Sequence, residues 1–292
     1  MSSDLSSKLS ADRDLVERWL EMSLSKDEST LSAAVRYAVL PLGKGLRAAL
    51  CLWAAQAFAS EPDLSVQAAL PCAAAIELVH GMTLIYDDLP GMDNSELRRG
   101  RASTWMKFGE GAALLSGAAM LAQAFKFLSA CSDSAVIVDD LAVACHELAA
   151  GQLRDIELSR QAQSPSVATL VRLHNLKTAS LIRFAVTAGA RIGGATPPQC
   201  AAMGNFGAQL GLAYQIRDDV LDATGTAENL GKPSGQDTNK HTFVTCCGLA
   251  EANAWLRNTA DEAINSLAMT GLSESAQYPF KGVLKYAVER DR

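Results

Sequence analysis

The spacing of hydrophobic residues predicts helices along most of the chain. Apolar side chains recur every three or four residues from Ser10 to Leu24 and again from Leu31 to Leu40. The turn PLGKG follows the second stretch, and a third helix, rich in alanine and leucine, begins at the basic residues Lys44 and Arg47. The first part of the chain is therefore expected to form three helices.

The stretch from Ser65 to Tyr86 differs from these helices because it is apolar on nearly all sides. It is rich in alanine and contains few polar residues, among them Glu77 and His80. A helix without a polar face is expected to be buried at the centre of its neighbours. This central helix would deliver Asp87, and Asp88 beside it, at its carboxyl end.

The rest of the chain is also helical in pattern, and no stretch shows persuasive strand-like alternation. The expected helices cover residues 110–130, 134–160, 165–191, 198–223, 241–269 and 273–289. The segment TGTAENLGKPSGQDTNK, which contains several glycines, is a loop by composition. With no linker visible, the sequence predicts one all-α domain over residues 1–292, a bundle of long helices.

Composition and charge narrow the classes of partner. The chain has 292 residues, 49% of them hydrophobic, which is enough to bury a substantial core. Its formal net charge of -6 disfavours a nucleic-acid or anionic-membrane binder, because those surfaces attract basic patches. A small anionic ligand would need local help from a metal ion and arginines.

Cysteines and the amino terminus indicate the cellular compartment. The seven cysteines are scattered without the CxxC spacing of a zinc site, so reduced thiols are expected. The amino terminus carries acidic residues early and lacks the order of a signal peptide. No uninterrupted apolar run reaches about 18 residues, the length that suggests a membrane span. We therefore expect a soluble, cytoplasmic protein without a membrane span.

Candidate chemistry is concentrated in the segment LIYDDLPGMDNSELRRG, residues 84–100. It contains Asp87, Asp88 and Asp93, and two arginines follow them. Carboxylates this close repel one another unless a hard cation lies among them, and Mg2+ prefers one or two carboxylates together with phosphate oxygens. The arginines suit the remaining phosphate oxygens. This first aspartate motif therefore predicts a metal-bridged diphosphate site.

A second group of carboxylates lies in the segment YQIRDDVLD. Asp218, Asp219 and Asp222 share one face of an expected helix, because spacings of three and four residues bring side chains together. Three negative charges on a buried face need a counter-ion. Facing each other across a bundle, this second aspartate motif and the first could hold several Mg2+ ions against one diphosphate. A solvated helix face is the alternative for either motif alone.

The pair Asp139 and Asp140 does not fit this pattern. Neither a carboxylate three to six residues later nor a following pair of arginines accompanies it. We interpret this pair as a helix cap or a solvated surface.

With both motifs in this order, the chain resembles the trans-isoprenyl diphosphate synthase family, which includes farnesyl and geranylgeranyl diphosphate synthases. The similarity runs from PLGKGLR to YAVERDR, and DDLPGMD resembles the first motif of bacterial and plant-type short-chain enzymes. The resemblance implies a helical bundle around a central cavity, Mg2+ as cofactor and a homodimer. The substrates would be isopentenyl diphosphate and an allylic diphosphate.

The resemblance implies roles for two sets of residues. Six aspartates would serve the metal: Asp87, Asp88, Asp93, Asp218, Asp219 and Asp222. Asp87 and Asp93 match direct ligands with Asp88 beside them, and Asp218 matches the leading ligand of the second motif. Five basic residues would bind diphosphates: Lys44, Arg47, His80, Arg98 and Arg99.

Among these basic residues, Arg98 resembles the arginine that clamps the allylic diphosphate. The other four match positions that hold isopentenyl diphosphate, the substrate bound without metal. The residues alone leave alternatives open. Lys44 or Arg47 could cap a neighbouring helix end, and His80 could be a core histidine.

Four further residues match catalytic positions of the family: Lys177, Thr178, Gln215 and Lys232. Lysines offset the departing diphosphate, whereas Thr and Gln oxygens can face an allylic cation without attacking it. Lys232 would lie on a loop that closes over the site and excludes water. The implied mechanism is ionisation of the allylic diphosphate, attack by the double bond of isopentenyl diphosphate and removal of a proton.

Four substitutions stand out among the departures of the chain from the family pattern. GKRLRP is here GKGLRA, with Gly45 and Ala48 in place of Arg and Pro, so positive charge is reduced. GKPTxH is here GRASTW, with Ala102 in place of Pro and Trp105 in place of His. A tryptophan is too large to be a neutral change at a packed helix start.

The resemblance assigns product length to Met82 and Thr83, which lie five and four residues before the first aspartate. These residues match the positions that form the floor of the pocket for the growing tail. Met82 is flexible and unbranched, so it blocks the tail less than an aromatic residue would. A twenty-carbon product is therefore expected ahead of a fifteen-carbon one, which stays open.

Two other functions compete with chain elongation. A class I terpene cyclase has a first aspartate motif, but its second metal motif mixes Asn/Asp, Ser/Thr and Glu, whereas the second motif here is all aspartate. A non-catalytic regulatory subunit of a prenyl synthase would be expected to have degenerate aspartates, and both motifs here are intact. Chain elongation is therefore the favoured reaction.

Overall fold

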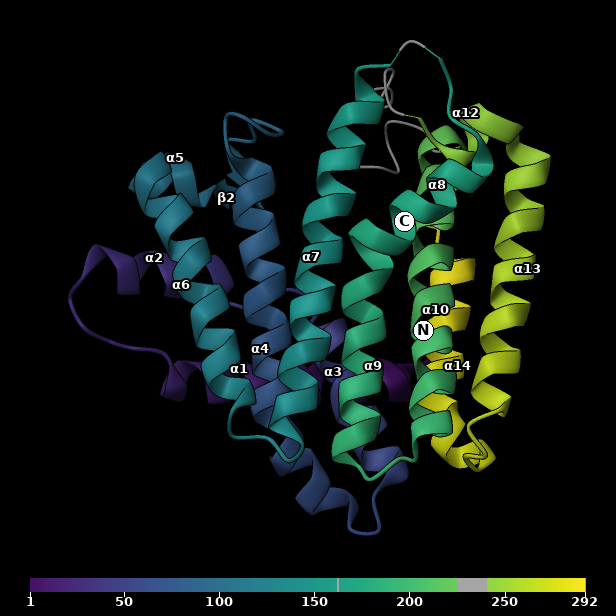
Figure 1. The fold of residues 1–292 in the computed structure, drawn as a ribbon, viewed down its shortest axis with the longest axis horizontal. Coiled ribbons are helices and arrows are strands. Elements are labelled where there is room, and N and C mark those ends of the chain that lie inside the picture. Colours follow the sequence, from purple (N-terminus) through teal and green to yellow (C-terminus); the bar gives the residue numbers. More distant parts are fainter. Residues whose placement is uncertain (162, 225–240, 292) are drawn as a thin grey trace. The chain divides into compact units, whose positions relative to one another are not determined.

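The all-α prediction is confirmed by the computed structural model, which describes residues 1–161, 163–224 and 241–291 (Figure 1). The first helices are α1 (Ser3–Ser23), α2 (Thr30–Val39), α3 (Leu46–Phe58), α4 (Pro62–Asp88), α5 (Thr104–Phe108) and α6 (Glu110–Leu128). The later helices are α7 (Ser134–Ser159), α8 (Val167–His174), the π-helix η1 (Asn175–Ala179), α9 (Ser180–Ile192), α10 (Pro197–Thr224), α12 (Phe243–Cys247), α13 (Leu249–Ala268) and α14 (Glu274–Glu289). Strands β1 (Leu97–Arg98) and β2 (Arg101–Ala102) form an antiparallel hairpin.

Internal contacts divide the chain into two compact units. The N-unit consists of Ser3–Ala142 and Ala188–Ala195. The C-unit consists of Met1–Ser2, Val143–Thr187 and Thr196–Arg292. The first aspartate motif belongs to the N-unit and the second to the C-unit. The expectation of one domain over residues 1–292 stays a prediction.

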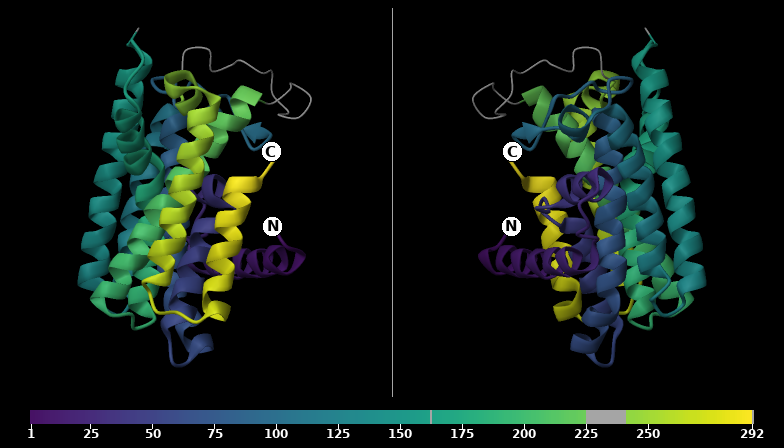
Figure 2. Two further views of the ribbon diagram at one scale, coloured as in Figure 1. Left: turned by 90° about the vertical axis from the view of Figure 1, so that its right-hand side faces the viewer. Right: turned by 90° about the vertical axis from the view of Figure 1, so that its left-hand side faces the viewer.

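Helix α4 is the centre of the N-unit. It packs against α6 and α3, and α1 crosses α4 instead of running along it (Figure 2). Nearly every side chain of α4 from Leu70 to Val79 is buried. Helix α6 approaches α4 closely at a glycine, because a Cβ on Gly117 would lie 2.5 Å from the ring of Tyr86. The predicted buried central helix is therefore confirmed, and it ends at Asp88.

Helix α10 has a comparable place in the C-unit. It packs against α13, α14 and η1. Phe206 on α10 meets Phe280 on α14 edge to face, with ring centroids 5.7 Å apart. A Cβ on Gly211 would lie 2.6 Å from the Cα of Ala179, so the absence of a side chain lets α10 approach η1. The second aspartate motif begins about two turns later on α10.

Local features differ from the sequence prediction in three places. The stretch 165–191 is divided into α8, η1 and α9. The stretch 241–269 is interrupted at Gly248, whose φ of 84° glycine adopts without strain. The hairpin that pairs Leu97 with Ala102 is absent from the prediction, because two residues per strand are too few to show alternation.

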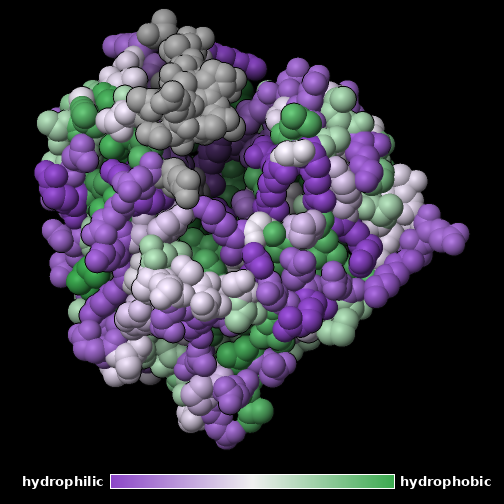
Figure 3. All heavy atoms as spheres, turned by 180° about the vertical axis from the view of Figure 1, so that it is seen from behind, coloured by the Kyte–Doolittle hydropathy of each residue, from purple (hydrophilic) through white to green (hydrophobic). Residues whose placement is uncertain are grey.

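All seven cysteines are free thiols, as expected. Within the described residues, α4 and α6 are long and apolar enough to cross a membrane, judged by length and composition alone. Core helices share these properties, and the apolar window of α4 is 72% buried. The face seen in Figure 3 carries hydrophobic residues in patches among hydrophilic ones. The expected absence of a membrane span stays a prediction.

Candidate active site

The first aspartate motif begins in the last turn of α4 and continues in the loop that follows. The amide of Asp93 donates to the carbonyl of Asp87 at 2.9 Å, and the amide of Ser95 donates to the carbonyl of Asp88 at 3.1 Å. These bonds fold the loop back against the end of α4. Asp87 is half-buried and Asp93 is exposed, so both side chains are accessible to a ligand.

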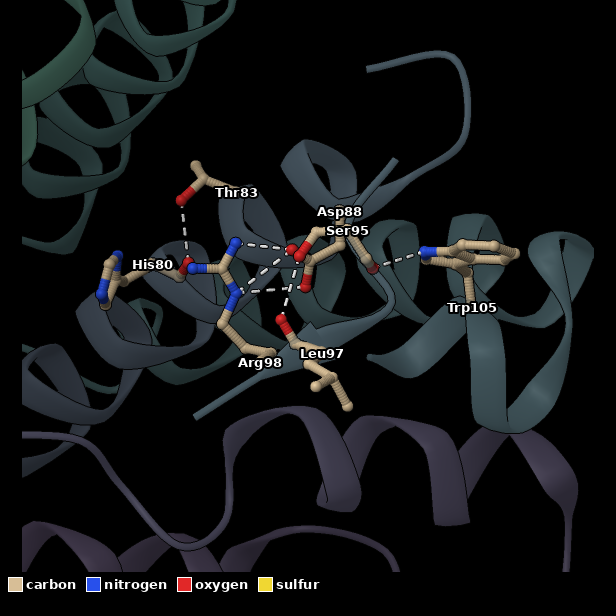
Figure 4. Close-up of polar contacts among 7 residues, drawn as sticks. All are labelled: His80, Thr83, Asp88, Ser95, Leu97, Arg98 and Trp105. Carbon is tan, nitrogen blue, oxygen red and sulfur yellow. Dashed lines mark hydrogen bonds and ion pairs between the residues drawn. The ribbon is translucent and has the colours of Figure 1, made fainter. Parts of the chain in front are cut away.

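Asp88 differs from the other two aspartates because its side chain is only 3% exposed. The Arg98 guanidinium contacts it from Nη2 at 2.5 Å and from Nε at 3.2 Å to each carboxylate oxygen (Figure 4). This hydrogen bonding raises the pKa of Arg98. A buried carboxylate needs such a partner. Arg98, predicted to clamp the allylic diphosphate, is therefore bound to Asp88 in this structure.

Trp105 helps to fix the end of the same loop. Its indole N–H donates to the carbonyl of Ser95 at 2.9 Å, and the Ser95 hydroxyl donates to the carbonyl of Leu97 at 2.9 Å (Figure 4). In the adjoining hairpin, the carbonyl of Ala102 accepts a 2.7 Å bond from the hydroxyl of Tyr37. The departure at Trp105 is thus accommodated at the start of α5, half-buried, with its polar edge bonded to the loop.

Two arginines of the N-unit, Arg47 and Arg99, act on Glu77, a buried carboxylate in α4. Burial raises the pKa of Glu77, and Arg47, the Ala48 amide and Arg99 oppose this rise. The Ala48 amide donates to Glu77 Oε1 at 3.2 Å. A proline in place of Ala48 would have no N–H to make this bond. The departure at Ala48 therefore provides Glu77 with a partner.

His80 lies about one turn after Glu77 and contacts Arg47, with 3.5 Å between Nε2 and Nη1. Burial, with the nearby charges of Arg47 and Arg99, lowers the pKa of His80 well below its usual range. The ring is therefore neutral at pH 7. Arg99 reaches the turn PLGKG, since a Cβ on Gly43 would lie 2.6 Å from its Nη2.

The same turn supplies the remaining predicted cation of the N-unit. Lys44 is exposed and follows Gly43 directly. Gly45 has a φ of 64°, and its Cβ would lie 2.9 Å from Cγ of Arg13. A larger residue would be strained there, which explains the departure at Gly45. Four predicted cationic or histidine positions are thus gathered in the N-unit: Lys44, Arg47, His80 and Arg99.

The second aspartate motif also has a buried member. Asp219 Oδ2 accepts a 2.8 Å hydrogen bond from the amide of Phe243, at the start of α12. Burial raises the pKa of Asp219 to about 7, the hydrogen bonds from Phe243 and Gln215 oppose the rise, and the charges of Asp218 and Asp222 add to it. The charges of Asp218 and Asp222 thus oppose ionisation of Asp219, and a bound cation would relieve this repulsion.

Asp218 and Asp222 are the accessible members of this motif. Asp218 is 45% exposed, and its Oδ1 accepts a 2.5 Å hydrogen bond from Nη2 of Arg290, the residue after α14. Asp222, one turn along α10, is exposed. Each motif thus combines one buried aspartate with two that can reach a ligand.

Lys177 and Thr178, predicted to be catalytic, lie on η1. A π-helical turn is frequent at functional sites. Lys177 Nζ donates to Asp155 Oδ2 on α7 at 2.5 Å, and the Thr178 hydroxyl donates to Gln215 Oε1 at 3.3 Å. Gln215 also hydrogen-bonds Asp219. Thr178 and Gln215 are therefore linked to the second motif within the C-unit, whereas Lys177 is paired with Asp155 on α7.

Two other predictions have different outcomes. Lys232 lies outside the described residues. Asp139 and Asp140 lie inside α7, so they are not a cap; Asp139 is exposed, and Asp140 is 3.7 Å from Arg191. The surface interpretation is confirmed for Asp139.

Sequence reasoning missed the partners of the predicted residues. Glu77 is visible in the sequence as a lone carboxylate in an apolar helix, a signal that could have shown its role. No spacing points to Asp155 or Arg290, because each meets its partner only through packing between helices.

The accessible aspartates fit a hard divalent cation that binds together with a phosphate. Among the residues that the structure describes, no three acidic, histidine or cysteine side chains converge into a complete metal site. Mg2+ needs no such site, because it takes one or two carboxylates and completes its octahedral shell with water and phosphate oxygens. Asp87 and Asp93 provide such oxygens in the N-unit, and Asp218 and Asp222 provide them in the C-unit.

Comparison with known proteins identifies the family. The polyprenyl synthetase pattern matches residues 28–273. This chain belongs to the polyprenyl synthetase family. It is 36% identical over 257 residues to a farnesyl diphosphate synthase from Geobacillus stearothermophilus, and the aligned region covers 84% of each chain.

Two further relatives support this assignment. A chloroplastic geranylgeranyl pyrophosphate synthase from Capsicum annuum is 34% identical over 281 residues, 93% of this chain and 74% of that one. An apo structure of an FPP/GFPP synthase from Zymomonas mobilis is similar with a TM-score of 0.86 at 29% identity, covering 99% of this chain and 100% of that one. The predicted family and enzyme class, a prenyltransferase, are confirmed.

Proposed function

We propose that this polyprenyl synthetase is a short-chain all-trans prenyl diphosphate synthase. It joins isopentenyl diphosphate head to tail to an allylic diphosphate and gives geranylgeranyl or farnesyl diphosphate. The observation that carries the proposal is that the N-unit has two different groups of charged side chains, each suited to one diphosphate. One is the accessible carboxylate pair Asp87 and Asp93, which could bind a diphosphate through Mg2+, and the other is the pair of arginines near Glu77, Arg47 and Arg99. The reaction joins two substrates that each carry a diphosphate, and only the allylic substrate loses its diphosphate group. Such a reaction needs one site of each kind.

We assign the group around Glu77 to isopentenyl diphosphate. Lys44, Arg47 and Arg99 bring positive charge to a substrate whose diphosphate is retained. His80 is neutral, so it can donate a hydrogen bond without adding to the repulsion between the arginines. Glu77 offsets that repulsion from the buried side. Holding the substrate in this way would position its double bond for attack.

We assign the aspartate motifs to the allylic diphosphate. Mg2+ held by their accessible carboxylates would neutralise the diphosphate and make it a better leaving group. Asp88 and Arg98 fix the first motif, and Asp219 fixes the second by bonding to Phe243.

The remaining residues would position and stabilise. Lys177 would offset charge on the leaving diphosphate, and Thr178 and Gln215 would present neutral oxygens to the allylic cation. None of them needs to act as a nucleophile. Lys232, outside the described residues, is assigned to the closing loop by resemblance alone.

Product length is assigned to the α4–α6 side of the N-unit. Met82 is buried on α4, and a Cβ on its neighbour Gly81 would lie 2.7 Å from Cε of Met120 on α6. The Thr83 hydroxyl donates to the carbonyl of His80 at 2.8 Å, so Thr83 is bonded to its own helix (Figure 4). A flexible Met82 would yield to a growing tail, which favours twenty carbons over fifteen.

One experiment tests the reaction. The purified protein is incubated with Mg2+, isopentenyl diphosphate and, in separate reactions, the five-, ten- and fifteen-carbon allylic diphosphates, and product length is measured by chromatography. Fifteen- or twenty-carbon products that disappear with a chelator support the proposal. Conversion of an allylic diphosphate without isopentenyl diphosphate would indicate a terpene cyclase, and no turnover would indicate a regulatory subunit. Either outcome rejects the proposal.

The same proposal includes a homodimer. Leu114 and Leu115 on α6 are large apolar side chains exposed on the N-unit, and exposed apolar residues of this kind favour burial against another surface. Light scattering of the purified protein over a range of concentrations would give twice the mass of one chain. The cytoplasmic location stays a prediction.

A further inference from the structure

Arg290, which follows α14, connects that helix to the second aspartate motif on α10. Its Nη2 lies 2.5 Å from Asp218 Oδ1 and 2.9 Å from the carbonyl of Tyr214. The Arg290 side chain is only 8% exposed, whereas that of Asp218 is 45% exposed. A buried guanidinium therefore contacts the Asp218 carboxylate, which is itself accessible to solvent.

Arg290 is held in place by contacts other than the one with Asp218. Its amide donates to the carbonyl of Tyr286 at 3.0 Å. Its carbonyl accepts hydrogen bonds from Nε and Nη2 of Arg217 at 2.9 and 2.6 Å. Its guanidinium carbon lies 3.9 Å from the ring centroid of Tyr214. The arginine is thus ordered before any ligand binds, so little further entropy is lost when it orients Asp218.

The contact depends on the shape of the arginine side chain and not only on its positive charge. A planar guanidinium can stack on Tyr214 while it donates sideways to a carbonyl and a carboxylate, and a lysine ammonium lacks this shape. Partners that hydrogen-bond a ligating carboxylate fix its orientation, and their loss weakens metal binding.

We propose that Arg290 is a positioning residue, which holds the Asp218 carboxylate in the orientation that binds Mg2+ together with diphosphate. The inference rests on the proposed function, because that function makes Asp218 a metal-binding residue. It adds a residue from outside both aspartate motifs to the set on which metal binding depends.

The experiment measures binding directly. Isothermal titration calorimetry follows the binding of Mg2+ with inorganic diphosphate to wild type, Arg290→Gln and Arg290→Lys. We expect Arg290→Gln to weaken binding about tenfold, a typical effect of losing such a partner, and Arg290→Lys to weaken it less. Lys285→Gln removes a positive charge from an exposed site on the same helix and should leave binding unchanged.

A double-mutant cycle separates positioning from a general effect on folding. If Arg290 acts through Asp218, Arg290→Gln should have no further effect on binding in an Asp218→Asn background. The KM for isopentenyl diphosphate should also stay unchanged, because its assigned residues lie elsewhere. Thermal unfolding of each variant, and retained partial binding by Arg290→Lys, show that the proteins are folded.

Three outcomes would overturn the inference. Unchanged binding in Arg290→Gln would show that Asp218 needs no such support. Tighter binding would show that Arg290 is a counter-ion that competes with the metal. An equal loss in the Asp218→Asn background would show a structural effect that does not pass through Asp218. If the wild type catalyses prenyl transfer and any of these outcomes is observed in the variants, only the inference about Arg290 is rejected. If the wild type shows neither binding of Mg2+ with diphosphate nor turnover, the proposed function is rejected as well.

Discussion

The first and second aspartate motifs both combine a buried carboxylate with accessible ones, but their partners come from different distances along the chain. In the first motif, Asp88 pairs with Arg98, ten residues away. In the second, Asp219 accepts a hydrogen bond from the amide of residue 243, and Asp218 pairs with Arg290, seventy-two residues away. The first motif is a local structure, whereas the second depends on the folding of the C-unit.

The chemical kind of partner also differs between the buried aspartates of the two motifs. A guanidinium brings a full charge to Asp88, whereas the Phe243 amide brings only a dipole to Asp219. The hydrogen bonds to Asp88 raise the pKa of Arg98, and burial raises the pKa of Asp219 to about 7 in spite of the amide. Asp88 is therefore held by a charge pair, and Asp219 by a backbone hydrogen bond.

The largest effect is expected from removing one accessible carboxylate of either motif. Asp87→Asn and Asp218→Asn should each lower kcat/KM about a thousandfold, because each removes a charge assigned to the cation that stabilises the leaving diphosphate. Steady-state kinetics with isopentenyl and allylic diphosphates measures this. Asp139→Asn, at an exposed position on α7, is the matched control and should keep full activity. Wild-type rates in either motif variant would remove that motif from the site.

A smaller effect concerns the surroundings of the second motif. His174 stacks on Phe243 with ring centroids 5.8 Å apart, and burial lowers its pKa from 6.5 to about 4. At His174, the unfolded chain therefore binds more protons than the folded protein between these pH values. This contribution to stability is present above pH 6.5 and is lost as the pH falls towards 4, by about 3 kcal/mol at most.

His174→Phe tests this effect because it keeps an aromatic ring and removes the proton uptake. Urea unfolding at pH 7 and pH 5 measures the free energy of unfolding of wild type and variant. The variant should lose less stability between the two pH values. An identical loss in both proteins would show that another group is responsible.

The next effect tests the local pair of the first motif. Arg98→Gln should lower the free energy of unfolding by about 2 kcal/mol, because it leaves Asp88 buried without its charge partner. This value is below the full cost of breaking a buried ion pair, because Arg98 is partly exposed to solvent. Thermal or urea unfolding measures the change. Arg99→Gln, which alters the next residue, should cost less.

A second variant makes the interpretation of Arg98 specific. In the Asp88→Asn background there is no buried charge to compensate, so Arg98→Gln should cost much less stability. An equal cost in both backgrounds would mean that Arg98 stabilises the loop in some way other than through Asp88.

The smallest expected effect is a change in product length. It concerns the first motif alone, because only the first motif is preceded by residues assigned to the product pocket. Met82→Tyr should shorten the product and Met82→Ala should lengthen it, with about a tenfold change in product ratio, equivalent to about 1.4 kcal/mol. Chromatography of the products measures this. Met106→Ala, on the exposed side of α5, is the control. Unchanged product lengths in both Met82 variants would reject the assignment.

Much of the fold was predictable because helical periodicity is a local property. The apolar stretch before Asp87 predicted α4 and its burial, and both are observed. The π-helical turn η1 was not predicted, because apolar periodicity indicates a helix without distinguishing its hydrogen-bonding pattern over five residues. The hairpin after the first motif was likewise too short to leave a pattern.

The candidate site divides in the same way. The sequence by itself determined the two aspartate motifs, their order and the arginine that follows the first, because those residues act within a few turns of one another. Only the tertiary structure decided which aspartate is buried in each motif and what holds it. The pairs of Lys177 with Asp155 and of Asp218 with Arg290 form where helices pack side by side. No periodicity encodes such meetings, because they depend on the packing of whole helices and not on spacing along one of them.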